Sequence, residues 1–181
     1  MDQTNWDTEL RLFLRQWMYG LFRGFETQSE EIQSAILNHC GSACAHPQAS
    51  IFFQEAWDDA SDLDCFLKIL NEKYCSDTFK LNHDGSIQVE YSKCYCPLHQ
   101  RELVNSSLLQ KCGQAWLKEV FQSTVNSRVN VEGLESICTG GKTCNFLIHF
   151  SKEQEHIINF QSYLKDSMKI KIHHYSDKNR I

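Results

Sequence analysis

The residues with the most chemical potential in this 181-residue chain are its nine cysteines, a large number for its length. The number is odd and we expect the chain to be intracellular, so a disulfide framework is disfavoured and reduced thiols are expected. Reduced thiols bind metals, act as nucleophiles or fill a core as small hydrophobic groups. The nine lie at positions 40, 44, 65, 75, 94, 96, 112, 138 and 144.

Four residues of the C-terminal half combine thiolate and carboxylate chemistry. Cys112 lies on the apolar face of an expected helix, Glu135 on the apolar face of an expected strand, and Cys144 begins the apolar face of the next strand. Cys138 lies in the turn between those strands. An inward carboxylate needs a cation or a hydrogen-bonded partner, and sulfur with oxygen ligands suits tetrahedral zinc. Together with Cys96, which ends the preceding hairpin, these groups could supply the ligands of such a zinc site.

A second interpretation needs no metal. The three cysteines would be unreactive core thiols, and Glu135 would lie on the surface because the strand register is shifted by one residue. The two interpretations differ in whether these side chains converge.

Helices dominate the first part of the chain, which we assign to residues 1–74 as the N-terminal helical part of one domain. Apolar residues at helical spacing predict an amphipathic helix over residues 10–25, whose aromatic stripe we expect to face the core. A second helix should begin at Thr27 and stop at Gly41. Pro47 then breaks the chain, and a helix should begin within residues 61–64 and extend to Tyr74.

From residue 78 the apolar period changes to two. A hairpin is expected around Asp84-Gly85, a helix over residues 106–123, and a second hairpin from strands 129–137 and 144–150. Residues 75–150 would form the hairpin-helix-hairpin core, and residues 151–181 a C-terminal helix and tail. The fold class is therefore α+β, an antiparallel sheet of two hairpins with helices packed on it.

The net charge of the chain argues against two classes of binding partner. Eighteen basic and 23 acidic residues give a net charge of −5 with interspersed signs, which disfavours nucleic acid and anionic membranes as partners. The first residues contain an acid and no apolar run, and no stretch approaches the length of a membrane span. We expect a cytoplasmic protein.

The same cysteine motifs carry a family resemblance over about residues 75 to 150. Cys112, Glu135-Ser-Ile-Cys138 and Gly-Gly-Lys-Thr-Cys144 resemble the 4-vinyl reductase domain, also called the hydrocarbon-binding domain. The resemblance implies zinc at Cys112, Glu135, Cys138 and Cys144, with Cys96 as an alternative ligand. It also implies a nearby pocket for a small apolar molecule and a fold like that of trafficking-complex subunits. Cys94-Tyr-Cys-Pro-Leu98 is also similar to a segment of L-2-amino-thiazoline-4-carboxylic acid hydrolase-like bacterial proteins.

Three functions follow from these observations. The first is a module that binds or senses a small apolar or aromatic molecule, with a structural zinc and Trp116 in the pocket. The second is a hydrolase of a small cyclic C–N substrate, in which a metal-bound water or Cys96 attacks and His99 is the base. The third is an interaction module, with the helix of residues 10–25 as the interface of a homodimer.

Overall fold

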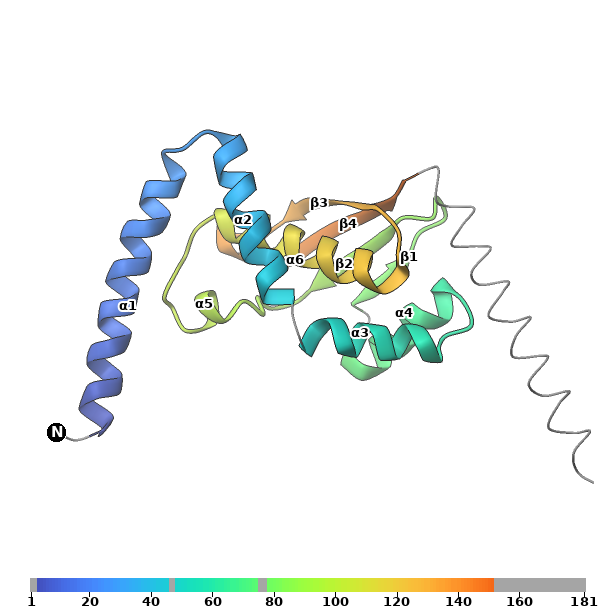
Figure 1. Ribbon diagram of the computed structural model, residues 1–181, viewed down its shortest axis with the longest axis horizontal. Helices are drawn as coiled ribbons and strands as arrows, with labels where there is room; N and C mark the ends of the chain where they lie inside the picture. The colour runs from blue at the N-terminus through green and yellow to red at the C-terminus, as the bar shows by residue number, and fades with distance from the viewer. Residues whose placement is uncertain (1–2, 46–47, 75–77, 152–181) are drawn as a thin grey trace, which may run out of the picture.

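The computed structural model describes residues 3–45, 48–74 and 78–151 (Figure 1). These residues form an α+β domain, as the sequence predicts. The helices are α1 (Gln3–Glu26), α2 (Glu30–Ala45), α3 (Gln48–Asp59), α4 (Leu63–Tyr74), α5 (Pro97–Gln100), α6 (Leu108–Val125) and the 3-10 helix η1 (Ile137–Thr139). The strands are β1 (Phe79–Leu81), β2 (Ile87–Tyr91), β3 (Val129–Glu135) and β4 (Cys144–Phe150).

Both predicted hairpins are present and join into one antiparallel sheet of order β1-β2-β4-β3. Gly85 allows the first turn because it adopts a φ of 82°, a value that glycine reaches at little cost. The two hairpins meet along β2 and β4, where Val89 pairs with Phe146. The sheet therefore brings the segment after β2 close to the start of β4.

The core lies between the sheet and the helices. Inward side chains alternate along β4, where Phe146 and Ile148 are buried. Helix α6 packs on β3 and β4, while α3 packs on α6 and α4 packs on β1. Phe53 of α3 is fully buried among aromatic rings of α4, α6 and β1. Helix α3, which supplies this central ring, is not among the helices predicted from the sequence.

The helix predicted to end at Gly41 instead continues to Ala45. Gly41 is buried where α2 crosses α6, and a Cβ atom at this position would lie 2.5 Å from the Cβ atom of Ala115. Glycine here allows two helices to approach closely, so the prediction that it terminates α2 is wrong. Cys40 and Cys44 consequently belong to one continuous helix, and both are exposed.

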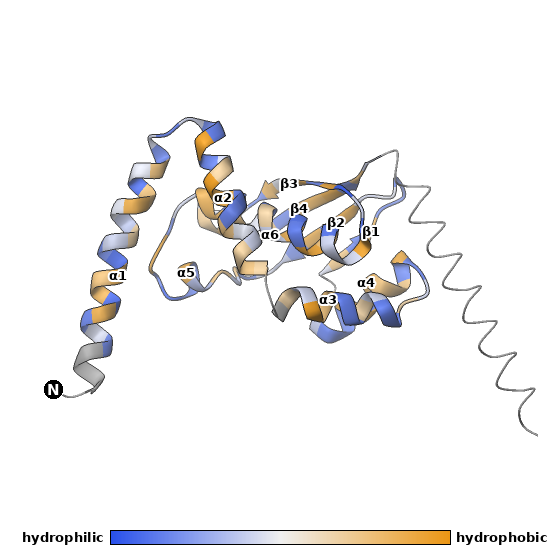
Figure 2. Ribbon diagram, in the orientation of Figure 1, coloured by the Kyte–Doolittle hydropathy of each residue, from blue (hydrophilic) through white to orange (hydrophobic). Residues whose placement is uncertain are grey.

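The first helix is present, but the expectation that its whole aromatic stripe faces the core is wrong. Phe22 is buried with Val104, Leu108 and Leu109, whereas Phe13 and Trp17 are 59% and 55% exposed. The N-terminal half of α1 stands away from the sheet (Figure 1), and apolar residues recur along it (Figure 2).

The predicted C-terminal helix and tail fall outside the described residues, which end at Ser151. Within the parts of the chain that are described, no helix has both the length and the apolar character needed to cross a bilayer.

Candidate metal centre

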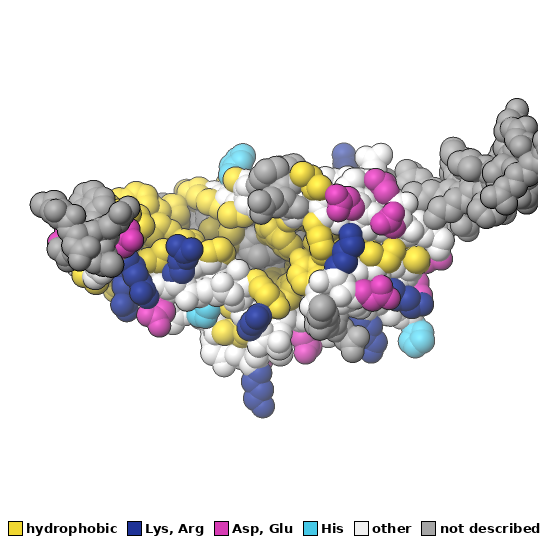
Figure 3. All heavy atoms as spheres, turned by 90° about the horizontal axis from the view of Figure 1, so that it is seen from below, with side chains coloured by type: hydrophobic (Ala, Val, Ile, Leu, Met, Phe, Trp, Pro, Cys, Tyr) yellow, Lys and Arg dark blue, Asp and Glu magenta, His cyan; other side chains and the backbone are white. Residues whose placement is uncertain are grey.

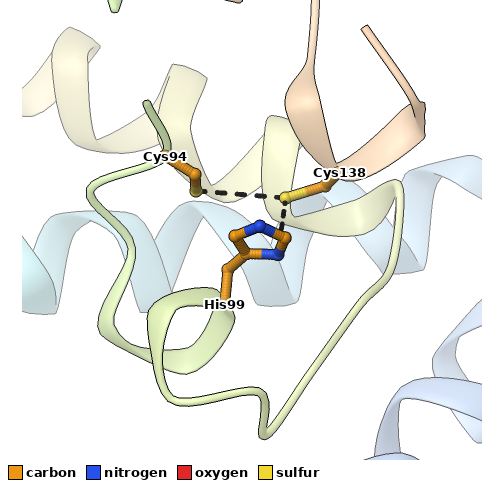
Figure 4. Close-up of side chains that lie close together, drawn as sticks. All are labelled: Cys94, His99 and Cys138. Atoms are coloured by element: carbon orange, nitrogen blue, oxygen red, sulfur yellow. Dashed lines mark hydrogen bonds between the residues drawn. The ribbon is translucent and has the colours of Figure 1, made fainter. Parts of the chain in front are cut away.

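Three metal-ligand side chains from two separate segments converge at one end of the sheet (Figure 4). The Sγ atom of Cys138 lies 4.0 Å from the Sγ atom of Cys94 and 3.5 Å from Nδ1 of His99. The three ligand atoms all lie within 4.8 Å of one another, and the three residues are partly buried. Cys94, His99 and Cys138 therefore form a candidate metal centre.

The distances agree with tetrahedral coordination. Zinc binds sulfur at about 2.3 Å and imidazole nitrogen at about 2.0–2.1 Å. At the tetrahedral angle these lengths put two sulfurs about 3.8 Å apart and a sulfur about 3.6 Å from a nitrogen. The observed 4.0 and 3.5 Å separations are close to both values, so an ion fits with small side-chain movements.

Cys94 and His99 are brought together by a sharp reversal after β2. Cys96 precedes α5, and Pro97 suits the first helical position because its fixed φ is helical and its missing N–H needs no partner. The carbonyl of Cys96 accepts hydrogen bonds from the N–H groups of His99 and Gln100. The Gln100 side chain donates to the carbonyl of Cys94 at 3.0 Å, which ties the two ends of the turn together.

Cys138 is held by the short helix η1 between β3 and β4. Ser136 caps this helix, since its hydroxyl accepts a hydrogen bond from the Cys138 N–H at 3.2 Å. Gly140 ends the helix with a φ of 89°. Backbone and cap contacts thus fix the backbone of Cys138 and leave its sulfur available to a ligand.

Burial raises the pKa of both thiols of the centre. The Cys94 pKa rises to about 12, chiefly because the thiol is desolvated and in part because Cys138 and Cys144 are near. Desolvation is also the main cause of the raised pKa of Cys138. Both thiols are therefore protonated at neutral pH unless a cation replaces the protons.

The structure brings one of the four sequence-predicted ligands, Cys138, into this centre. Cys144 is buried at the start of β4, and Cys112 is partly buried on α6. Both lie outside the cluster. The alternative ligand Cys96 packs with Cys112 and Cys138 in a small apolar group around Phe22.

Glu135 has a different environment from the one expected. A β-bulge at the end of β3 shifts its register, and its carboxylate accepts hydrogen bonds from the Lys142 N–H at 3.0 Å and the Thr143 hydroxyl at 2.6 Å. These contacts lower the Glu135 pKa, the Thr143 bond most of all. The carboxylate stabilises the hairpin turn that carries Cys138.

Trp116, the predicted ligand-binding residue, packs against the core with its ring 6.1 Å from that of Phe53 in an edge-to-face arrangement. Two surface hollows of about 390 and 300 Å³ are lined largely by polar side chains, and Trp116 borders neither. Among the described residues, Trp116 therefore contributes to the core.

Sequence reasoning did not assign Cys94 or His99 to a metal site. The sequence suggests His99 as a base beside Cys96, whereas the structure places its Nδ1 atom 3.5 Å from the Sγ atom of Cys138. The available signal was a cysteine and a histidine on either side of Pro97, since a proline-initiated turn can bring such residues to one side.

The described residues therefore define an α+β domain with a candidate Cys-His-Cys metal centre. The chain belongs to DUF6144, a family of unknown function, whose family model matches residues 6–155. No curated protein matches the sequence. Among solved structures, the fold is distantly similar to a trafficking protein particle complex subunit 3 from Naegleria fowleri, covalently bound to palmitic acid. The identity is 11%, the match covers 80% of this chain and 97% of that chain, and the TM-score is 0.42.

Proposed function

We propose that this domain is a zinc-binding module in which Cys94, His99 and Cys138 supply three ligands. The observation that carries the proposal is the pair of distances from the Cys138 sulfur, 4.0 Å to Cys94 and 3.5 Å to His99. Two thiolates and an imidazole favour zinc over the hard cations magnesium and calcium, which prefer oxygen ligands.

The bound ion would connect two parts of the sheet. Cys94 and His99 belong to the segment after β2, whereas Cys138 belongs to the turn between β3 and β4. Three protein ligands leave a fourth tetrahedral position for water or a small molecule. The thiols of Cys96 and Cys144 lie close enough to raise the pKa of Cys138 but outside the cluster, so we do not assign them as ligands.

A thiol nucleophile is a weaker interpretation of the same contact. A catalytic cysteine needs a lowered pKa, whereas burial raises the pKa of Cys138. The resemblance to 4-vinyl reductase domains, the binding of an apolar molecule and the hydrolysis of a cyclic C–N substrate stay predictions of the sequence. Among the described residues, the side-chain contacts favour metal binding over these functions.

The test is metal content per chain. Protein prepared under reducing conditions is stripped of metal, titrated with zinc, desalted and analysed by mass spectrometry for elements. We expect about one zinc per chain for the wild type and a loss of most of it for Cys138→Ser and His99→Ala, because two ligands bind much more weakly than three.

Cys112→Ser is the matched control, because this thiol is partly buried and reduced like the ligands but lies outside the centre. It should keep its zinc. A wild-type chain that binds none would contradict the proposal. Zinc lost in Cys112→Ser and kept in Cys94→Ser would instead support the ligand set predicted from the sequence.

A further inference from the structure

The outer face of α1, which we define as Leu10, Phe13, Trp17, Gly20 and Gly24, belongs to neither of the apolar clusters that the described residues form. Leu10, Phe13 and Trp17 are 47%, 59% and 55% exposed. A Cβ atom added at Gly20 or Gly24 would meet no atom within 4 Å. Figure 3 shows hydrophobic side chains gathered at the end of the molecule where α1 begins.

The opposite side of the same helix is anchored. Phe22 is buried against Val104, Leu108 and Leu109, with Met18 and Phe25 packed beside it. Arg11 donates a hydrogen bond to the carbonyl of Arg101. The domain therefore holds α1 by one side and presents the other to solvent.

The outer face has the spacing of a two-helix seam. Its five positions are separated alternately by three and four residues, which is the spacing of the a and d positions in a heptad repeat. Large side chains occupy the first three positions and glycines the last two. Such a face is complementary to itself when reversed, because each large residue can lie over a position that lacks a side chain or beside another ring.

We propose that this face binds the same face of a second copy of the chain, with the two α1 helices antiparallel. In a pair centred between Phe13 and Trp17, Leu10 of one copy lies over Gly20 of the other. Phe13 of one copy then lies beside Trp17 of the other. The proposal is independent of the metal centre, which is built from other elements.

The charged residues beside the outer face favour a second copy of the chain as the partner and an antiparallel arrangement of the two helices. Glu9, Gln16 and Arg23 are seven residues apart, are all exposed and border the same side of the outer face. In an antiparallel pair identical sides meet, so Glu9 of each copy faces Arg23 of the other and Gln16 faces Gln16. Arg23 already contacts Glu26 at 3.1 Å, but this exposed pair contributes little and leaves the guanidinium able to bind a second carboxylate.

A parallel pair would lack these contacts. Its helices would bring the side that contains Glu9 against the opposite side, which carries Leu14 and Leu21. Both leucines are already partly buried within the chain. The distribution of charge and burial therefore favours the antiparallel arrangement.

The test is the mass of the full chain by sedimentation equilibrium over a range of concentrations. The wild type should have twice the chain mass at high concentration. Trp17→Glu should raise the dissociation constant by about 30-fold or more, since a tryptophan at the centre of an interface carries much of the binding energy. Tyr19→Glu should leave it unchanged, because Tyr19 is 67% exposed on the far side of the same helix.

Direction is tested by exchanging charges. Glu9→Arg and Arg23→Glu should each weaken the dimer by about fivefold, because each places like charges opposite one another twice. The double variant should recover most of the wild-type affinity. Far-UV circular dichroism must show that every variant is folded.

A wild-type chain that stays monomeric at all concentrations overturns the proposal, whatever else the outer face binds. A folded Trp17→Glu variant that dimerises like the wild type also overturns it. A double charge exchange no better than either single change overturns the antiparallel arrangement.

Discussion

At the scale of single residues, the candidate centre depends on thiols that burial keeps protonated. The Cys94 pKa of about 12 reflects desolvation first and neighbouring thiols second. A zinc ion has to displace that proton and the proton of Cys138 before both sulfurs can bind. The affinity for zinc therefore depends on pH.

Zinc affinity should rise steeply with pH around neutrality. Because both thiols have a raised pKa, binding releases two protons, and the affinity should increase about a hundredfold per pH unit. Competition titrations against a chromophoric chelator at several pH values measure this slope. Cys112→Ser should keep the slope, although burial also raises the Cys112 pKa to about 12. A slope near zero would show that protonated thiols do not compete with the metal.

The residue scale is also where sequence reasoning found least of the site. It predicted Cys138 as a ligand in part from its place in a turn, which depends on local spacing. It did not join Cys94 and His99 to Cys138, because that contact requires the pairing of β2 with β4 and the reversal at Pro97. Contacts between distant segments leave no periodic signal in a sequence.

At the scale of elements, periodicity predicted both hairpins, α1, α4 and α6, since each has a regular apolar face. It did not predict α3, although Phe53, Ala56 and Trp57 are buried there at helical spacing, because this stripe is short and includes a small alanine. Gly41 shows a second reason for failure. The sequence alone does not distinguish a glycine at a helix crossing from a glycine at a helix end, because the difference lies in the partner helix.

Gly41→Ala should destabilise the fold although alanine is the better helix former. The added methyl group would lie 2.5 Å from the Ala115 Cβ atom and 2.7 Å from backbone atoms of Cys112 and Trp116. We expect the free energy of unfolding to fall by about 1–3 kcal/mol. Urea denaturation measures the change, with the exposed Asn38→Ala on the same helix as the control, expected within about 0.5 kcal/mol of the wild type. Equal stability of the two variants would mean that α2 and α6 shift apart at little cost.

At the scale of the whole molecule, the described residues pack around two apolar clusters. The larger joins α3, α4, α6 and the sheet, and the smaller joins the C-terminal half of α1 to the segment around α5. The α+β class follows from the order of the predicted elements. The exposure of half of α1 could not be predicted in this way, because an apolar helical stripe has the same sequence pattern whether it faces a core or another chain.

Phe53 should be essential for the larger cluster. Its ring is fully buried and contacts five others in edge-to-face geometry, those of Phe52, Phe66, Phe79, Trp116 and Phe121. Phe53→Ala should lower the free energy of unfolding by about 3–5 kcal/mol. The control is Ile51→Ala on the same helix, where the side chain is 57% exposed and the change should stay within about 0.5 kcal/mol. Thermal and urea unfolding would compare them, and similar values would contradict the central role of this ring.

The positions of Cys94 and Cys138, separated by 44 residues in the chain, have one more consequence. A cross-link between them closes a long loop and removes conformations from the unfolded ensemble, an effect of about 4 kcal/mol for a covalent bridge of this span. That is a large share of the margin by which an ordinary domain stays folded. The concentration of available zinc would then control how long each molecule stays folded before it unfolds.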